Sequence, residues 1–163
     1  MPAVAPEVLR LRPTLDADLP ILYAQQQDPE SCRLAGTKPR SWEAFESAIR
    51  RSLADPRTVG RTIVLERAGG EVVAGGISCF VVADEDYVGY GLAREHWGRG
   101  LASRALALLL AEVTRRPLRA TAAAHNIASC RILSRSGFRV VGTRMGEETE
   151  RYVGCEVIDF VLE

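Results

Sequence analysis

A glycine-rich turn between a strand-like segment and an apolar helical segment constrains this 163-residue chain more than any other feature. The turn, WGRG at positions 97–100, follows the strand-like Tyr87–Leu92, and Leu101–Val113 after it has a helical pattern that is apolar on nearly all sides. Glycine permits close approach of backbone and left-handed dihedral angles. The first N–H groups of a helix lack an intrahelical partner and lie at the positive end of the helix dipole. The turn therefore predicts an anion site suited to phosphate or pyrophosphate.

Two common phosphate-binding motifs do not fit this turn. The dinucleotide-binding fingerprint would need glycine where Ser103 stands, and no G-K-[ST] sequence of a P-loop occurs in the chain. A G-x-G before a helix also occurs as a purely structural turn with a helix cap, and at this point both interpretations stay open.

The order of the predicted elements favours an α+β, or mixed α/β, fold over a regular doubly wound one. Predicted strands cover Val8–Arg12, Thr62–Arg67, Val72–Val82, Tyr87–Leu92, Leu118–Ala124, Phe138–Thr143 and Tyr152–Leu162. Predicted helices begin after Thr14 and after Ser41 and cover Leu101–Val113 and Asn126–Ser136, the last of which is capped by Asn126. Gly69-Gly70 predicts a hairpin between the second and third strands.

Length and composition predict one domain over residues 1–163, located in the cytoplasm. The chain shows no secretory signal pattern and no apolar run of the roughly 20 residues that a membrane span needs. Its four cysteines have neither C-x-x-C nor zinc-ligand spacing, so we expect reduced thiols and no metal.

The net charge is formally zero, with 21 basic and 21 acidic residues, which argues against nonspecific binding of nucleic acid. The distribution is uneven, however. Positions 94–139 hold nine arginines and two glutamates, a net charge of +7, and the rest of the chain carries −7. The basic block suits one small polyanion, and the acidic remainder, dense after Met145, could favour a cationic acceptor.

Two spaced motifs together resemble the GNAT acetyltransferase superfamily, and more narrowly its RimJ/RimL-like branch of ribosomal-protein N-terminal acetyltransferases. The first motif, Y-V-G-Y-G-L-x-x-x-x-W-G-R-G-L-A, starts at Tyr87, and the second, N-x-A-S-x-x-x-L-x-x-x-G-F, runs from Asn126 to Phe138. The opening L-R-L-R-P, followed by Asp16 and Asp18, is also similar to that branch. The resemblance implies a twisted, mostly antiparallel sheet of about seven strands with a central parallel splayed pair, flanked by about four helices.

The resemblance also implies acetyl-CoA as cosubstrate, without a metal. The pantetheine arm would lie between Tyr87–Leu92 and Leu118–Ala124, and the pyrophosphate would lie on the N–H groups of the glycine-rich turn. The residues implied to contact the cosubstrate are Leu92, Arg94, Trp97, Gly98, Arg99, Gly100, Leu101, Ala102, Asn126 and Ser129. Ser129 and Asn126 are the implied catalytic residues.

The chain departs from the superfamily pattern at two positions that matter for acid–base chemistry. The tyrosine that often protonates the departing thiolate falls on Leu133, so Ser129, one helical turn after Asn126, is the nearest replacement. The acidic residue often found on the donor strand falls on Tyr87. A third position, the first of the pyrophosphate motif, is Trp97, as is common in the RimJ/RimL-like branch.

An enzyme without a strong base suits weakly basic amines. An α-amino group has a pKa of about 7.7–8.0 and is partly neutral at cellular pH, whereas a lysine at about 10.4 is almost fully protonated. The acidic run at positions 84–86 is either a proton relay or a solvated loop. His125 is either a proton relay or a hydrogen-bonded structural histidine, and His96 is expected to be exposed.

Three further groups of residues have two interpretations each. Cys130 is expected to be a buried thiol rather than a nucleophile. Arg131 and Arg135 either reach a phosphate of CoA or are ordinary surface arginines. Trp42 and Phe45 either line an acceptor pocket or pack in the core.

The predicted activity is transfer of an acetyl group to a primary amine by direct attack in a ternary complex. A protein or peptide N-terminal amine is the first choice of acceptor. Acetylation of a small-molecule amine, such as an antibiotic or a polyamine, and a CoA-binding sensor module without catalysis are the alternatives. The partners are then acetyl-CoA and the amine, with no nucleic acid or membrane, and the protein is a monomer or a homodimer.

Overall fold

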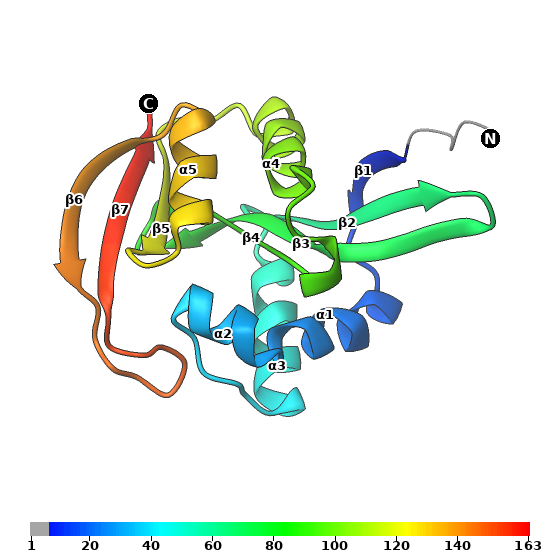
Figure 1. The fold of residues 1–163 in the computed structure, drawn as a ribbon, viewed down its shortest axis with the longest axis horizontal. Helices are drawn as coiled ribbons and strands as arrows, with labels where there is room; N and C mark the ends of the chain where they lie inside the picture. Colours follow the sequence, from blue (N-terminus) through cyan, green and yellow to red (C-terminus); the bar gives the residue numbers. More distant parts are fainter. Residues whose placement is uncertain (1–6) are drawn as a thin grey trace.

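The computed structural model describes residues 7–163, which form a seven-stranded sheet flanked by helices on both faces (Figure 1). The strands are β1 (Val8–Pro13), β2 (Val59–Arg67), β3 (Gly70–Val82), β4 (Glu85–Leu92), β5 (Leu118–Ala123), β6 (Arg139–Met145) and β7 (Glu156–Leu162). Their order across the sheet is β1-β2-β3-β4-β5-β7-β6. All neighbours are antiparallel except β4 and β5, which are parallel, so the predicted α+β fold class is confirmed.

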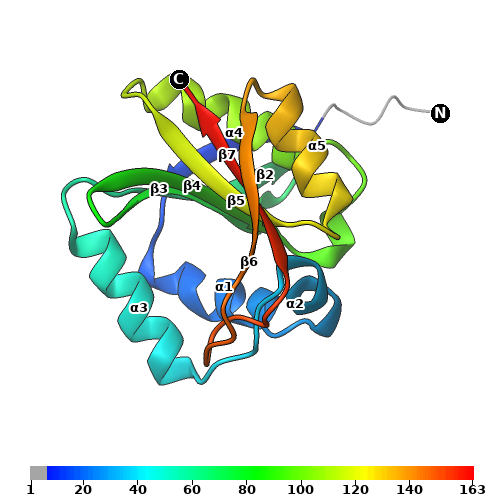
Figure 2. The same ribbon diagram turned by 90° about the vertical axis from the view of Figure 1, so that its left-hand side faces the viewer.

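The helices divide between the two faces of the sheet (Figure 2). They are α1 (Leu19–Gln26), α2 (Pro29–Ala35) and α3 (Trp42–Ala54) on one face and α4 (Leu101–Glu112) and α5 (Ile127–Arg135) on the other, with short 3₁₀ turns at Asp16–Asp18 and Arg94–His96. None of the helices in residues 7–163 is long and apolar enough to cross a membrane.

The sequence pattern did not predict α2, so the described residues contain five α-helices rather than four. This helix has only seven residues and little apolar periodicity. It forms because Asp28 caps its first turn by accepting a hydrogen bond from the N–H of Ser31, and because Gly36 ends it in a left-handed conformation.

Two strands, β4 and β7, begin at residues other than those predicted. Strand β4 begins at Glu85, so two of the three consecutive acidic residues belong to a strand and not to a loop. Strand β7 begins at Glu156, because residues 152 and 153 instead bond to the segment after α2. The hairpin between β2 and β3 is confirmed, with Gly69 and Gly70 both at positive φ.

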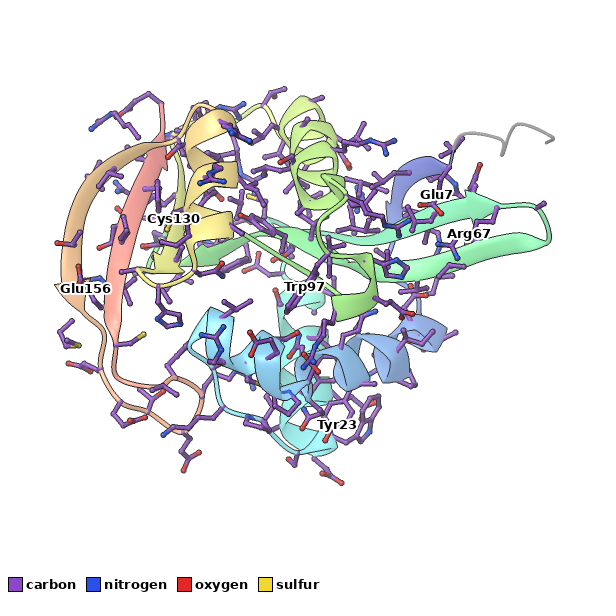
Figure 3. All side chains as sticks on the ribbon, viewed as in Figure 1. Glu7, Tyr23, Arg67, Trp97, Cys130 and Glu156 are labelled. Carbon is purple, nitrogen blue, oxygen red and sulfur yellow. The ribbon has the colours of Figure 1, made fainter. Side chains whose placement is uncertain are left out.

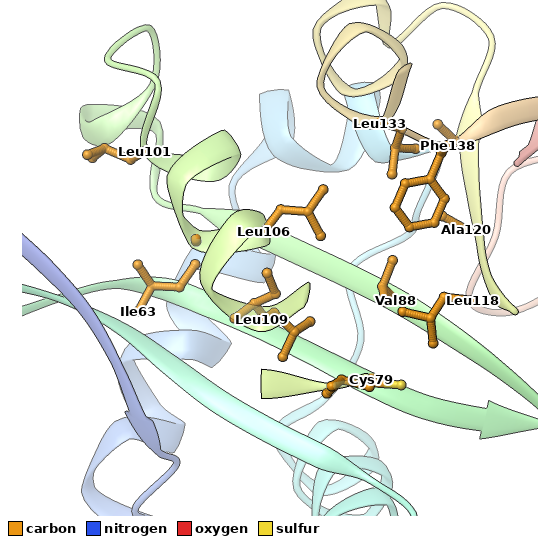
Figure 4. Close-up of a cluster of buried hydrophobic side chains, with 14 of the residues drawn as sticks. Ile63, Cys79, Val88, Leu101, Leu106, Leu109, Leu118, Ala120, Leu133 and Phe138 are labelled. Carbon is orange, nitrogen blue, oxygen red and sulfur yellow. The ribbon is translucent and has the colours of Figure 1, made fainter. Parts of the chain in front are cut away.

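The main core lies between the sheet and helices α4 and α5 (Figure 4). Leu101, Leu106 and Leu109 of α4 pack toward Ile63 and Val88 of the sheet. A smaller apolar cluster on the opposite face centres on fully buried Phe45. Its aromatic neighbours include Tyr23 and Trp42, so the core interpretation of the aromatic residues of α3 is the one that the packing supports.

A buried ion pair joins the first strand to the turn that follows it. The guanidinium of Arg12 donates to both carboxylate oxygens of Asp18, at 2.7 and 2.8 Å, and Asp18 is 3% exposed. Asp18 also accepts from the N–H of Leu15 and from the hydroxyl of Thr62 on β2. The carboxylate therefore has partners for both oxygens, as a buried charge requires.

The parallel strands β4 and β5 pair at one position only, where Tyr87 lies opposite Arg119. Beyond that point, toward the carboxyl ends of both strands, no further pairing joins them. The two strands therefore separate along the second half of β4, as the resemblance implied. The separation exposes backbone and side chains of both strands to a gap in the middle of the sheet.

Candidate active site

A cavity of about 130 Å³ lies where β4 and β5 separate. Its walls are residues 88–90 of β4, residues 120–123 of β5, Ala35 of α2, and Asn126, Ser129 and Leu133 of α5. The lining of β5 is almost entirely alanine, because small side chains leave room between the strands. The cavity thus combines an apolar channel with a small number of polar groups from α5 and β4, which is typical of a ligand site.

The polar groups of the cavity are centred on a hydroxyl pair. The phenolic oxygen of Tyr90 lies 2.8 Å from the hydroxyl oxygen of Ser129. Burial raises the pKa of Tyr90, so its phenol stays protonated at neutral pH, although the hydrogen bond to Ser129 opposes that shift. Tyr90 can therefore donate to Ser129 and leave the hydroxyl proton of Ser129 free to point into the cavity.

Tyr90 was not among the residues predicted for the site. The alternation of β4 places Val88, Tyr90 and Leu92 on one face of the strand, and Val88 of that face is buried under the helices. That alternation, combined with the implied gap beside β4, is the signal that could have identified Tyr90.

Asn126 holds Ser129 in place. Its side-chain oxygen accepts a hydrogen bond from the backbone N–H of Ser129 at 3.2 Å, which makes Asn126 the N-cap of α5, as predicted. The cap defines where the helix starts and so places Ser129 in its first turn, facing the gap. Both implied catalytic residues line the same cavity.

The glycine-rich turn has the backbone geometry that the sequence predicted. Gly98 and Gly100 have φ of +76° and +71°, in the left-handed region that other residues rarely adopt. No other atoms lie within 4 Å of where a Cβ would be at either position. Gly100 is the N-cap of α4 and provides no side chain to cap it, so the N–H groups at Leu101 and Ala102 remain available to a ligand.

Trp97 fastens this turn to the end of β4 (Figure 3). Its indole N–H donates to the backbone carbonyl of Leu92 at 2.9 Å. That carbonyl therefore already has a partner within the protein. The geometry gives Trp97 a clear positioning role, in addition to any contact that it makes with a ligand.

The side chain of Arg99 is paired within the protein. Its guanidinium lies 3.0 Å from a carboxylate oxygen of Glu7 and 2.7 Å from Nδ1 of His96. Glu7 also accepts from Arg67, so it bridges the turn and β2 (Figure 3). His96 is 4% exposed, and the prediction that it is exposed is wrong, because the turn folds back over it. Burial lowers the pKa of His96 and so favours the neutral ring that accepts from Arg99.

Arg94 is likewise paired within the protein. Its guanidinium donates to both carboxylate oxygens of Asp28, at 2.6 and 3.1 Å. Because Asp28 also caps α2, this pair ties the segment after β4 to the helix on the other side of the gap. Arg94 and Arg99 thus have carboxylate partners already.

Three exposed arginines, by contrast, make no side-chain hydrogen bond or ion pair within residues 7–163. They are Arg104 on α4 and Arg131 and Arg135 on α5. Arg131 and Arg135 are four residues apart and so share one face of α5. These are the arginines whose charge is available to an anionic ligand near the gap.

The other residues considered in the sequence analysis add no reactive group to the cavity. Burial raises the pKa of Cys130, which keeps it a thiol and a poor nucleophile. Leu133 is a core residue at 1% exposure. The three consecutive acidic residues are paired with arginines, namely Asp84 with Arg57, Glu85 with Arg119 and Asp86 with Arg115. None of these carboxylates lines the cavity.

A second cavity, of about 360 Å³, lies between α2, the residue before Asn126 and the connection between β6 and β7. It is lined by Cys32, Arg33, Gly36, Thr37, His125, Val153 and Cys155. The ring nitrogen Nε2 of His125 lies 2.6 Å from the backbone carbonyl of Arg33. Among residues 7–163, no group of three or more His, Cys, Asp or Glu side chains is arranged to hold a metal ion.

The strand gap, Ser129 in the first turn of α5 and the glycine-rich turn before α4 make up the candidate site. Residues 9–139 match the family model described as "Acetyltransferase (GNAT) domain", and the chain belongs to that family. It is therefore an acetyltransferase, in a family whose acetyl donor is acetyl-CoA.

Solved structures share the fold at low sequence identity. The microcin C7 self-immunity acetyltransferase MccE, in complex with acetyl-CoA and AMP, has a TM-score of 0.75 at 18% identity, over 94% of this chain and 91% of that one. A spermidine N-acetyltransferase from Vibrio cholerae, in complex with CoA and spermine, has a TM-score of 0.73 at 18% identity, over 94% of each chain. The ribosomal L7/L12 α-N-protein acetyltransferase RimL, in complex with CoA, has a TM-score of 0.71 at 18% identity, over 94% and 93% of the two chains. A search of curated protein sequences gave no match.

Proposed function

We propose that this acetyltransferase moves the acetyl group of acetyl-CoA to the N-terminal amine of a protein or peptide, in the manner of the RimJ/RimL-like branch. The observation that carries the proposal is the cavity between β4 and β5, in which Asn126 positions Ser129 and Tyr90 bonds to its hydroxyl. The proposed catalytic domain is residues 1–163, acting in the cytoplasm as a monomer or a homodimer.

Acetyl-CoA would lie with its phosphates at the start of α4 and its thiol end in the strand gap. The N–H groups of Gly98, Arg99, Gly100, Leu101 and Ala102 would bind the pyrophosphate. Arg104, Arg131 and Arg135, which have no side-chain partner within residues 7–163, would meet the remaining phosphate. The backbone N–H groups of Leu92 and Arg94 would donate to carbonyl oxygens of the pantetheine arm, since the carbonyl of Leu92 already accepts from Trp97.

The reaction joins the amine nitrogen to the acetyl carbon and breaks the carbon–sulfur bond. Water would take the proton that the amine nitrogen loses and relay it to the hydroxyl pair. Ser129 would donate its hydroxyl proton to the departing thiolate, and Tyr90 would donate its own proton to the oxygen of Ser129. The raised pKa of Tyr90 keeps that proton in place before reaction. Much of the rate would come from holding amine and thioester together.

An α-amine suits this site better than a polyamine. Neither cavity has a carboxylate in its lining, and a polyamine brings several ammonium charges that would need such partners. The acidic residues after Met145 also lie outside the lining, and Glu148 among them is paired with Lys38. A weakly basic α-amine can instead enter neutral, because its pKa lies near cellular pH.

A coupled assay tests the proposal. Release of free thiol from acetyl-CoA is measured with a peptide that has a free N-terminus, with the same lysine-containing peptide blocked at its N-terminus, and with spermidine. We expect acetylation of the free peptide at its α-nitrogen, located by mass spectrometry. Preference for spermidine or for the lysine of the blocked peptide would refute the acceptor assignment. Absence of any thermal shift with acetyl-CoA would refute the cosubstrate site.

A further inference from the structure

The guanidinium of Arg99 lies on the side of α4 away from the strand gap, although its backbone belongs to the glycine-rich turn. Its partner Glu7 directly precedes β1, and Glu7 and Arg67 lie on the opposite side of α4 from α5 (Figures 1 and 3). The strand gap is on the α5 side, because Asn126 and Ser129 of α5 line it. The side chain of Arg99 is therefore held on the far side of the turn from the gap.

Both terminal nitrogens of this guanidinium have acceptors. Nη1 of Arg99 lies 3.0 Å from one carboxylate oxygen of Glu7, and Nη2 lies 2.7 Å from Nδ1 of His96. The other oxygen of Glu7 accepts from Nε of Arg67 on β2 at 2.7 Å. The hydrogen bond from Arg67 holds the pKa of Glu7 below its usual value, so Glu7 is charged at neutral pH. One carboxylate therefore joins the turn to β2.

His96 is the buried member of this group. It is 4% exposed, and within residues 7–163 its Nε2 has no hydrogen-bond partner and lies 3.9 Å from a carboxylate oxygen of Glu95. A guanidinium can only donate, so Nδ1 accepts from Arg99 only while the ring is neutral. Burial lowers the pKa of His96; Arg99 and Arg67 act in the same direction, and Glu95 and Glu7 oppose them. The ring is therefore neutral at neutral pH.

The turn depends on these contacts because its glycines cannot hold it. Gly98 and Gly100, on either side of Arg99, have positive φ and open space at their Cβ positions. Glycine also has more backbone freedom to lose than any other residue. Within residues 7–163, the side-chain hydrogen bonds of the turn are that of Trp97 to the carbonyl of Leu92 and those of Arg99. Arg99 therefore fixes the part of the turn between the two glycines.

We propose that Glu7 and His96 are positioning residues for the cosubstrate, which hold Arg99 so that the N–H groups of the glycine-rich turn are ordered for the pyrophosphate of acetyl-CoA. This inference rests on the proposed location of the pyrophosphate and adds the residues that prepare it. The side chain of Arg99 then supports the turn and is not a phosphate ligand. A turn that is ordered before binding loses less conformational entropy when the ligand arrives, which increases the affinity.

The direction of the change in affinity separates the two roles of Arg99. Glu7→Gln is expected to raise the Kd for acetyl-CoA by about 10-fold, as for loss of one charge-assisted hydrogen bond, and to leave kcat at saturating acetyl-CoA unchanged. If Arg99 were a phosphate ligand, its release from Glu7 would lower the Kd. Calorimetric titration distinguishes these results. Glu66→Gln, beside Arg67 on β2 but paired with Arg10, is the matched control and should bind normally.

A double-mutant cycle tests whether Glu7 acts through Arg99. Arg99→Gln should also raise the Kd for acetyl-CoA, and Glu7→Gln/Arg99→Gln should bind no more weakly than Arg99→Gln alone. Glu7→Asp keeps the charge and should recover part of the affinity lost in Glu7→Gln. Additive losses in the double variant would refute the route through Arg99. Thermal unfolding without ligand shows that each variant is folded.

The pH dependence of binding tests His96. Dephospho-CoA is the probe, because it lacks the phosphate monoester, whose second pKa of about 6 would change its own charge in this range. Its Kd should be constant at neutral pH and rise as the pH falls below about 6.5, since a protonated His96 repels Arg99. His96→Asn replaces Nδ1 by an amide oxygen that does not titrate and should remove this rise. Identical pH profiles for the wild type and His96→Asn would refute the role of His96.

The outcomes also separate this inference from the proposed function. If the wild-type protein binds acetyl-CoA and Glu7→Gln binds it equally or more tightly, only the positioning role of Glu7 is refuted. If the wild-type protein does not bind acetyl-CoA, the proposed function itself fails.

Discussion

The hydroxyl of Tyr90 on β4 and the hydroxyl of Ser129 on α5 lie 2.8 Å apart, although 39 positions separate them in the chain. The pair spans the point where β4 and β5 part, and both residues line the resulting cavity. A buried phenol that donates to a serine leaves that serine's own proton free for another acceptor. In the proposed reaction, this pair would connect the strand beside acetyl-CoA with the helix that supplies the acid.

Removal of the phenolic hydroxyl should slow the chemical step without weakening binding. We expect Tyr90→Phe to lower kcat by about 10-fold or more, within the range for loss of proton-transfer assistance, with KM for acetyl-CoA little changed. Steady-state kinetics would measure both. Tyr87→Phe removes a hydroxyl from the opposite face of the same strand, where the ring stacks on Phe80, and is the control.

The same pair gives a second, independent prediction. If Tyr90 acts through Ser129, the double variant Tyr90→Phe/Ser129→Ala should be about as slow as Ser129→Ala alone, because both changes interrupt one proton path. A double-mutant cycle on kcat measures this. Additive losses in kcat would show that the two hydroxyls act separately.

The left-handed glycine at the start of α4 should control affinity for acetyl-CoA. Gly100→Ala places a Cβ at φ +71°, a conformation that costs about 1 kcal/mol for an L-residue, and should raise the Kd. Gly100→Glu adds a negative charge where the pyrophosphate would lie and should abolish binding. Calorimetric titration with acetyl-CoA gives both values. Gly142→Ala, at a glycine without positive φ and with open space around it, should bind normally.

The charges of the arginines on α4 and α5 that have no partner within residues 7–163 should increase the affinity for CoA. Replacement of Arg104, Arg131 and Arg135 by Gln should weaken binding of CoA, most at low salt, since exposed charges are screened by ions. If one of them meets the 3′-phosphate, its substitution should affect CoA more than dephospho-CoA. Arg51→Gln, on α3 at the opposite face of the sheet, is the control. Equal affinities in all variants would contradict the assignment.

Stability at acidic pH should depend on Asp18. Its hydrogen bonds from Arg12 hold its pKa below the usual value, so its contribution to stability is complete above about pH 3.9 and is lost as the pH falls through the folded-state pKa. Asp18→Asn leaves Arg12 with Glu71 as its remaining ionic partner and should cost about 3 kcal/mol at pH 7. Urea unfolding between pH 7 and pH 3 would show a flatter pH dependence for this variant. Asp16→Asn, at an exposed carboxylate, should change nothing measurable.

Much of the fold follows from short-range patterns. The β2–β3 hairpin, the strand before the glycine-rich turn, helix α4 and the Asn126 cap of α5 were all predicted, because periodicity, glycine at positive φ and helix capping are local effects. Helix α2 was missed since its capping by Asp28 is not accompanied by an apolar stripe. The start of β7 was placed too early because residues 152 and 153 bond to the segment after α2, which no local pattern reveals.

The chain by itself determined which residues could meet a phosphate-bearing cosubstrate and which helix would hold Ser129, because the backbone conformations involved are set within a few positions. Tertiary structure decided which of these side chains are free to act. It pairs Arg94 with Asp28 and Arg99 with Glu7, buries His96, and leaves Arg104, Arg131 and Arg135 unpaired in the described residues. It also brings Tyr90 to Ser129, and His125 to a carbonyl 92 positions away. Such contacts depend on how the sheet opens and how the helices pack, and side-chain partners that lie so far apart in the chain leave no periodic signal in the sequence.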